Sequence, residues 1–307
     1  MAADKQTAKA QAAAGGVGWA PYLFCAPVML YLLVFQAYPL LQELYLSFTQ
    51  TSLLSPGQHD WVGWRNYTDL FEQEEFSQVL VVTLVYTVAC VVFAIGIGLG
   101  TALLLNMPFR GRGIARSLIT IPWAAPPVAV ALVFIWMFNG QYGVLQHLLN
   151  FLGLSSGMEG WLDNPSRALT AVLLTTVWQI FPFTSVVILS ALQGVSNDLR
   201  EAAVIDGADR FSVFGAVVWP AIRPTVMLLT LFITIWSLRR FDLIWLMTQG
   251  GPIGSTNTLV IELYRRAFTY RELGEAAAVG MVGLSLALVI TVVYFRLTVR
   301  AERAAGH

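Results

Sequence analysis

Long apolar stretches, separated by short polar ones, run along most of this chain of 307 residues. About 20 apolar residues in an α-helix cross the hydrocarbon core of a bilayer, and six stretches reach that length. The pattern therefore predicts an all-α polytopic membrane protein with six transmembrane helices. The expected spans are residues 19–47, 76–109, 117–138, 168–193, 221–248 and 276–295.

Prolines and charged residues mark irregular points within these spans. Pro27 and Pro39 are expected to bend the first helix, because proline removes a backbone donor. Arg239, Arg240 and Asp242 interrupt the fifth span, and ionisable groups in such a place usually face a cavity or a partner. Two interpretations stay open. The arginines reach the outer interface or pair with Asp242, or a polar group lines a substrate path.

The distribution of lysine and arginine predicts the orientation of the spans, because these residues concentrate on the cytoplasmic side. With the N-terminus inside, the inner segments hold eleven of the 18 and the outer segments five, with Arg239 and Arg240 within the membrane. Both termini and the polar segment 196–224 are therefore expected in the cytoplasm. The outer segment 249–274 is expected to include a short amphipathic helix near 257–270.

A single transmembrane domain, residues 19–300, is expected between two cytoplasmic tails. Residues 1–18 are polar and rich in alanine and glycine, which predicts a flexible tail, and residues 301–307 form the other. The first tail does not resemble a signal peptide, because the apolar run after it is too long and lacks a clear cleavage site.

Composition and missing motifs narrow the possible functions. The chain is 57% hydrophobic and 12% charged with zero net charge, which places it in a bilayer and predicts no nucleic-acid partner. Cys25 and Cys90 lie in apolar stretches, so a disulfide scaffold is excluded. The only lysines are Lys5 and Lys9, near the N-terminus, so none can serve the lysine-containing loop that binds the phosphates of ATP. If ATP drives this protein, the ATPase is therefore another chain. No catalytic constellation or metal site is expected, and no cofactor bound by this chain.

Two clusters inside the predicted spans have alternative readings. Gly96 and Gly100, in the run from residue 96 to 100, predict close packing of helices rather than a nucleotide loop. Trp178, Gln179 and Pro182 belong to an aromatic cluster in mid-membrane. This cluster is either a packing feature or a platform for a sugar, whose apolar face stacks on rings while its hydroxyls form hydrogen bonds.

The polar segment 196–224 has its own local pattern. Ser196 is expected to cap a short helix, with Asp198 near the positive end of its dipole. Gly207 is expected to end that helix in a left-handed conformation, and a second amphipathic run follows. Pro220 and Pro224 mark the entry to the next span. Two short helices that meet at a glycine are also what an ordinary cytoplasmic loop would contain.

The spacing of Glu201-Ala202-Ala203, Gly207 and Pro220 resembles the EAA motif in the membrane subunits of ABC importers. Further stretches resemble the sugar-importer subgroup, similar to the larger membrane subunit of the maltose transporter. These stretches are residues 61–67, 205–208, 241–244 and 248–252. The resemblance implies a type I ABC importer permease fold, with a cytoplasmic coupling helix in an EAA loop of about residues 196–220.

This resemblance also implies that the chain lies in the bacterial cytoplasmic membrane, in contact with its lipid. It implies a set of protein partners as well. They are a second homologous permease subunit, two ATPase subunits that bind ATP and Mg, and an extracytoplasmic solute-binding protein. Glu201 would pair with a basic ATPase residue, and Gly207 would allow a sharp turn. The implied coupling residues are Glu201, Ala202, Ala203, Asp206 and Gly207.

A sugar site in the spans that flank this loop is implied as well. Arg240 replaces an asparagine of the related permease, which suggests an alternative, an anionic solute such as glycerol phosphate or a sulfonated or phosphorylated sugar. An ion-coupled secondary transporter, with Asp242 as its carboxylate, and a polytopic membrane enzyme are alternatives of other classes. The implied substrate-binding residues are Thr176, Gln179, Ile180, Phe183, Ile233, Trp236, Ser237 and Arg240.

Overall fold

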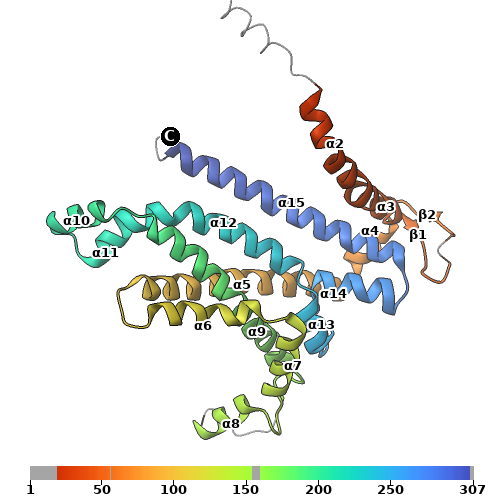
Figure 1. Cartoon of the computed structure of the whole chain (residues 1–307). Helices are drawn as coiled ribbons and strands as arrows, with labels where there is room; N and C mark the ends of the chain where they lie inside the picture. Colours follow the sequence, from red (N-terminus) through yellow and green to blue (C-terminus); the bar gives the residue numbers. More distant parts are fainter. Residues whose placement is uncertain (1–18, 56, 154–159, 305–307) are drawn as a thin grey trace, which may run out of the picture.

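The computed structural model describes residues 19–55, 57–153 and 160–304 as a set of helices with one two-stranded ribbon (Figure 1). Three short segments, η1, η2 and η3, are wider π-helical turns. The elements in chain order are α2 (Ala20–Leu32), η1 (Leu33–Ala37), α3 (Tyr38–Leu46), β1 (Thr49–Gln50), β2 (Asp60–Trp61), α4 (Arg65–Glu72), α5 (Glu74–Asn106), α6 (Arg112–Ala124), α7 (Pro127–Met137), α8 (Val144–Phe151), α9 (Pro165–Gln193), α10 (Asn197–Ile205), α11 (Arg210–Val213), η2 (Phe214–Val218), α12 (Trp219–Leu238), α13 (Asp242–Thr248), α14 (Leu259–Tyr264), η3 (Arg265–Thr269) and α15 (Leu273–Ala304).

The number of membrane spans agrees with the prediction when one bent pair is taken as a single span. Five described helical segments are long and apolar enough to cross a bilayer, namely 21–46, 74–106, 165–193, 210–238 and 273–300. The sixth span is the pair α6 and α7, which meet at an angle of 92°. The predicted tail 1–18 lies outside the described residues. Helix α15 continues to Ala304, into the stretch predicted as the C-terminal tail.

The third span is a bent pair of helices, where the sequence predicted one span over residues 117–138. Helix α6 ends at Ala124, and Ala125 is extended with ψ 134°. Pro126 disfavours helical backbone in the residue before it and offers no backbone donor, so Ala125 leaves the helix. Pro127 then starts α7 in a new direction.

The fifth span is also broken, where the sequence predicted one helix over residues 221–248. Helix α12 ends at Leu238, residues 239–241 are outside any helix, and α13 begins at Asp242. The span also begins earlier than predicted, because Arg210–Leu238 runs as one segment through Pro220. The π-helical turn η2 ends two residues before Pro220, and η1 ends two residues before Pro39. A wider turn at these places accommodates a proline nitrogen that donates no bond.

Close packing between α5 and α9 depends on Gly98, not on Gly96 and Gly100 as predicted. A Cβ at Gly98 would overlap the Thr184 side chain, whereas at Gly96 and Gly100 it would meet nothing within 4 Å. Residues 96 and 100 share one helix face, and residue 98 is on the opposite side, because successive residues turn by about 100°. The Thr184 hydroxyl donates to the Ala94 carbonyl at 2.7 Å across this contact.

Different elements form the two ends of the molecule (Figure 1). The ribbon β1–β2, α4 and the start of α15 lie at one end, and α10, α11 and the end of α15 at the other. The N-terminal helix α2 projects from the rest, and no residue of the most apolar part of span 21–46 is buried. This helix therefore exposes a large apolar surface within the single chain.

Candidate functional site

A pocket of about 500 Å³ lies where the two broken spans meet α9. The first break contributes Ala125 and Pro127, and the second contributes Arg239 to Asp242. We call this cavity the central pocket. Its lining residues are Trp123, Ala125, Pro127, Gln179, Ile180, Trp236, Arg239, Arg240, Phe241 and Asp242.

Arg240 is bound by groups of its own chain. Its Nε atom lies 3.2 Å from Asp242 Oδ1, and its side chain is 16% exposed against 41% for Asp242. Its Nη2 atom donates to Gln179 Oε1. The structure thus shows the internal pairing that was one of the two open interpretations, and the pair also lines the pocket, as the other requires.

Gln179 occupies the centre of this polar group. It is 4% exposed, and its Nε2 atom donates to the Ala125 carbonyl at 3.1 Å. Because Ala125 follows the last residue of α6 and is extended, its carbonyl has no partner in the regular ladder of that helix. Gln179 therefore joins one helix break to the other through its own amide.

Aromatic rings form the apolar part of the pocket. Phe183 stacks on Trp123 with ring centres 5.5 Å apart, and it lies at the same distance from Trp236. Trp123 and Trp236 line the cavity, and both are partly exposed. Rings next to a guanidinium and an amide suit a ligand with an apolar face and polar edges.

The predicted substrate residues divide into two groups. Gln179, Ile180, Trp236 and Arg240 line the pocket, and Phe183 supports its two tryptophans. The other three, Thr176, Ile233 and Ser237, are almost fully buried, and the Thr176 hydroxyl lies 2.9 Å from the Tyr86 hydroxyl.

Sequence reasoning missed the contribution of the third span. Trp123, Ala125 and Pro127 face the pocket because the chain turns at Ala125. The Pro126–Pro127 pair was the available signal, since two adjacent prolines make an unbroken helix unfavourable.

The predicted coupling residues lie on a separate unit formed by α10, α11 and the turn between them, which we call the α10–α11 unit. Gly207 has φ +85°, and its amide donates to the Val204 carbonyl. The Ala208 amide donates to the Ala203 carbonyl. These two bonds form a Schellman motif, which confirms the predicted left-handed end of the first helix. Ser196 stands at the N-cap position, but its side chain makes no capping bond there.

The second helix of this unit has a cap that sequence reasoning missed. Asp209 Oδ1 accepts from the Ser212 amide at 2.9 Å. Hydrogen bonds from the Ser212 side chain and backbone lower the pKa of Asp209 below its ordinary value. The spacing of Asp209 three residues before Ser212, two residues after Gly207, was the signal for this cap.

The α10–α11 unit exposes large apolar side chains among its polar ones. Ile205 is 85% exposed and Phe211 87%. Glu201, Ala202, Asp206 and Gly207 are exposed, and Ala203 is partly buried. Arg200 donates from Nη2 to the Leu192 carbonyl at 3.2 Å, which ties α10 to the end of α9.

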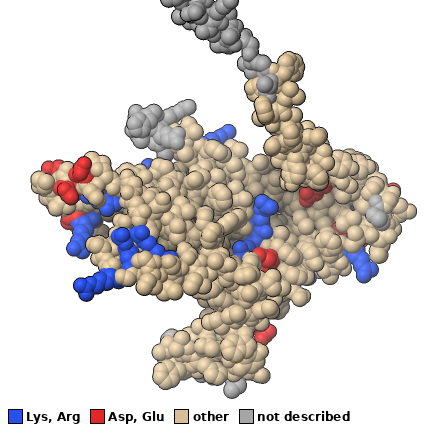
Figure 2. Space-filling view, viewed as in Figure 1, with Lys and Arg blue, Asp and Glu red and all other residues tan. Residues whose placement is uncertain are grey.

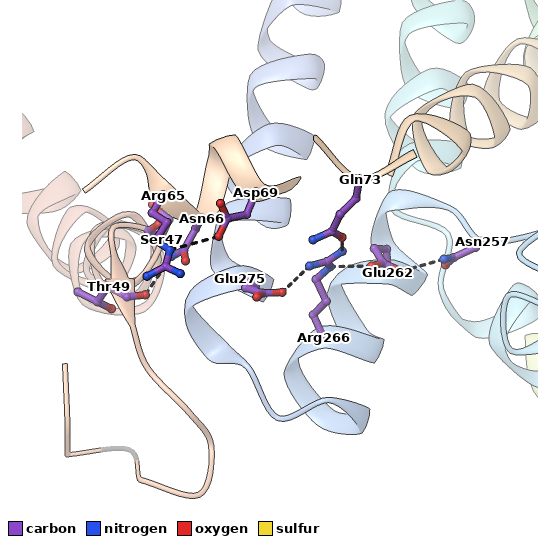
Figure 3. Close-up of polar contacts among 10 residues, drawn as sticks. All are labelled: Ser47, Thr49, Arg65, Asn66, Asp69, Gln73, Asn257, Glu262, Arg266 and Glu275. Atoms are coloured by element: carbon purple, nitrogen blue, oxygen red, sulfur yellow. Dashed lines mark hydrogen bonds and ion pairs between the residues drawn. The ribbon is translucent and has the colours of Figure 1, made fainter. Parts of the chain in front are cut away.

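A buried ionic cluster joins elements at the opposite end of the molecule (Figure 3). Arg266, 6% exposed, lies in η3, and its Nε atom is 2.6 Å from Glu262 Oε1. It also donates to Gln73 Oε1 at 2.7 Å and pairs with Glu275. These contacts connect η3 to the starts of α5 and α15. Helix α14 and η3 together occupy the place of the amphipathic helix that was predicted near 257–270.

A second polar group shown in Figure 3 fastens α4 to the end of α3. Asn66 Nδ2 donates to the carbonyls of Ser47 and Thr49, both at 2.9 Å. Within the part of the chain that the structure describes, no three metal-binding side chains come together.

Comparison with known proteins assigns the family. Residues 93–304 match the family of binding-protein-dependent transport system inner membrane components. The chain is 34% identical over 275 residues to the sulfoquinovosyl glycerol transport system permease protein SmoG of Agrobacterium fabrum, with 90% of this chain and 89% of that protein covered. It is 33% identical over 278 residues to the trehalose/maltose transport system permease protein MalF of Thermococcus litoralis, with 90% and 92% covered.

A solved structure supports the fold. A chain of a bacterial ABC transporter involved in the import of the acidic polysaccharide alginate superposes with a TM-score of 0.80 at 23% identity, covering 92% of this chain and 96% of that one. The type I ABC importer permease fold is thereby confirmed. With its matching profile, its relatives and this fold, the chain belongs to the inner membrane components of binding-protein-dependent transport systems.

Proposed function

We propose that this chain is a permease subunit that moves a sugar or sugar derivative across the bacterial cytoplasmic membrane. The central pocket carries this proposal, because it places Trp123 and Trp236 beside hydrogen-bonding groups where two spans break. A sugar offers an apolar face to such rings and hydroxyls to such polar groups. Two relatives are named for sulfoquinovosyl glycerol and for trehalose or maltose, which are carbohydrate compounds.

The α10–α11 unit is proposed as the site where ATP hydrolysis in partner subunits acts. Glu201 and Gly207 have the EAA spacing, and exposed Ile205 and Phe211 provide an apolar surface for a partner. Helix α9 leads into this unit and α12 leads out of it, so its displacement would reach the pocket through two helices. ATP and Mg would be bound by the two ATPase subunits, and this chain would supply no catalytic residue.

The remaining partners follow from the exposed surfaces. Helix α2 has an unburied apolar face, which lipid and a second homologous permease subunit would cover. Figure 2 shows blue arginine side chains gathered at the end that carries α10, α11 and the α5–α6 turn. The positive-inside rule then favours this end as cytoplasmic, and we propose both termini on the same side of the membrane. The opposite end would receive solute from an extracytoplasmic binding protein.

An anionic solute is the second candidate, and one observation favours it. The pocket is lined by Arg239, Arg240 and a single carboxylate, Asp242, so these three charges sum to one positive charge. A phosphate, sulfonate or carboxylate would gain charge-assisted hydrogen bonds there. The ion-coupled alternative has less support, because its carboxylate, Asp242, pairs with Arg240.

The test is reconstitution of the chain with its permease, ATPase and binding-protein partners in liposomes. Uptake of labelled maltose, trehalose and sulfoquinovosyl glycerol would be measured with and without internal ATP. We expect ATP-dependent uptake of at least one of these compounds. Uptake by this chain in the absence of any ATPase, or of none of the three compounds, would contradict the proposal.

A further inference from the structure

Gln179 uses both ends of its amide to bridge the two helix breaks around the central pocket. Its Nε2 atom donates to Ala125 at the α6–α7 break, and its Oε1 atom accepts from Arg240 at the α12–α13 break. The same contacts extend to Asp242, which pairs with Arg240. A continuous polar chain thus crosses α9 from one broken span to the other.

We propose that Gln179 is a positioning residue that holds the two broken spans in register on either side of the pocket. The resemblance assigns it only as a residue that touches the solute. Its burial at 4% exposure and its two internal partners indicate a second task. The Ala125 carbonyl is freed by the end of α6, and a buried polar group without a partner costs free energy. Gln179 supplies that partner and receives the Arg240 guanidinium on its other end.

The location of Gln179 explains why this bridge matters for transport. Gln179 lies on α9, which continues unbroken to Gln193 and the α10–α11 unit. Arg240 follows the end of α12, which begins on the other side of that unit. A movement of the unit would therefore reach the pocket along both helices, and Gln179 would hold the two walls together as they move. This consequence rests on the proposed function, whereas the bridge itself does not.

Hydrogen–deuterium exchange on the complete permease in lipid nanodiscs tests the bridge without any transport assay. Gln179→Met keeps the length of the side chain and removes both polar ends. We expect amides of residues 123–130 and of residues 238–244 to exchange roughly fivefold faster in this variant, which corresponds to one net hydrogen bond at each break. The double variant Arg240→Met with Asp242→Asn removes only the second arm, so only residues 238–244 should exchange faster.

Thr175→Val is the matched control for these variants. The Thr175 hydroxyl is fully buried on the same helix, and it donates to the Ala171 carbonyl one turn away. Its loss should leave exchange at both breaks unchanged. If Gln179→Met accelerates exchange at one break only, at neither, or throughout α5 and α15 as well, Gln179 does not join the two breaks. Failure of sugar uptake in liposomes would overturn the proposed function and leave this result intact.

Discussion

Single side chains decide the character of the central pocket, because two arginines and one carboxylate line it. Arg240 is largely buried, and Asp242 compensates its charge at 3.2 Å. A charge that loses its partner in such a place is costly, although the partial exposure of Asp242 moderates the cost. The pair therefore has to be tested by changing both residues as well as one.

Substitution of this pair separates an internal role from recognition of an anion. Arg240→Gln should lower uptake of a neutral sugar several-fold, because Asp242 is left unpaired inside the membrane. Arg240→Gln together with Asp242→Asn should restore that uptake to within about threefold of the wild type, since both charges are gone. Uptake in liposomes measures both. If the double variant stays as impaired as the single one for anionic solutes but not for neutral sugars, Arg240 acts on the solute directly.

Gly98 is the second position where one residue controls the structure. A Cβ at this position would overlap Thr184 and lie 3.1 Å from the Ser185 nitrogen, so Gly98→Ala should lower the free energy of unfolding by about 1–3 kcal/mol. Gly96→Ala and Gly100→Ala have open space and should be neutral or slightly stabilising. Thermal unfolding in detergent compares the three variants. Equal effects at all three positions would mean that α5 packs on α9 differently.

At the scale of elements, the α10–α11 unit is held by backbone geometry more than by buried side chains. Gly207 closes α10 with two Schellman bonds, and Asp209 caps α11 two residues later. Its exposed apolar residues have no partner within the unit itself. The direction in which α11 leaves α10 therefore depends on one glycine and one carboxylate.

Gly207→Ala should weaken coupling while the complex still assembles. Its φ of +85° strains any residue with a Cβ by about 1–2 kcal/mol, even though the surrounding space is open. We expect less sugar transported for each ATP hydrolysed. Gly111→Ala is the matched control, since Gly111 has the same φ and open space but precedes α6. An equal loss of coupling in both variants would remove the special role of the α10–α11 unit.

The Asp209 cap should make the stability of α11 depend on pH. Bonds from Ser212 lower the pKa of Asp209 in the folded chain, so its contribution is present above the unfolded pKa and is lost as the pH falls through the folded pKa. Asp209→Ala should increase amide exchange in α11 at neutral pH, whereas Asp209→Asn should retain the cap. Exchange that is unchanged in Asp209→Ala would show that packing, not this cap, holds α11.

At the scale of the whole molecule, polar contacts of Arg266 hold several helices together at one end, whereas the N-terminal helix α2 packs on little of the chain. Arg266 connects η3 to α5 and α15 at the end that we assign to the outside. Helix α2 instead has its apolar residues exposed, among them Phe24 at 85%. The single chain is therefore incomplete as a packed body and needs lipid or a partner subunit around α2.

The different exposure of the two cysteines allows the packing of α2 and α5 to be tested by chemical labelling. Cys25 is exposed on α2 and Cys90 is fully buried, so a maleimide should label Cys25 alone in the detergent-solubilised chain. Assembly with the second permease subunit should slow this labelling if α2 lies at the subunit interface. Cys25→Ser serves as the control and should abolish labelling. Labelling of Cys90 in the native chain would contradict the packing of α5 on its neighbours.

The sequence alone determined how many spans there are, the class of fold and the two short helices that meet at Gly207. Apolar length is a local property, and so is the glycine that ends α10, because a left-handed residue is read from one position. The EAA spacing likewise lies within one segment. These features needed no knowledge of which helices are neighbours.

Only the tertiary structure decided where the third and fifth spans break, which residues line the pocket and how Arg240 is paired. Gln179 and Ala125 are 54 residues apart, and Gln179 and Arg240 are 61 apart. No local pattern can specify such contacts, since they depend on how three helices pack. The same reason explains Gly98, because spacing shows that residues 96 and 100 share a face, but only packing shows which face meets α9.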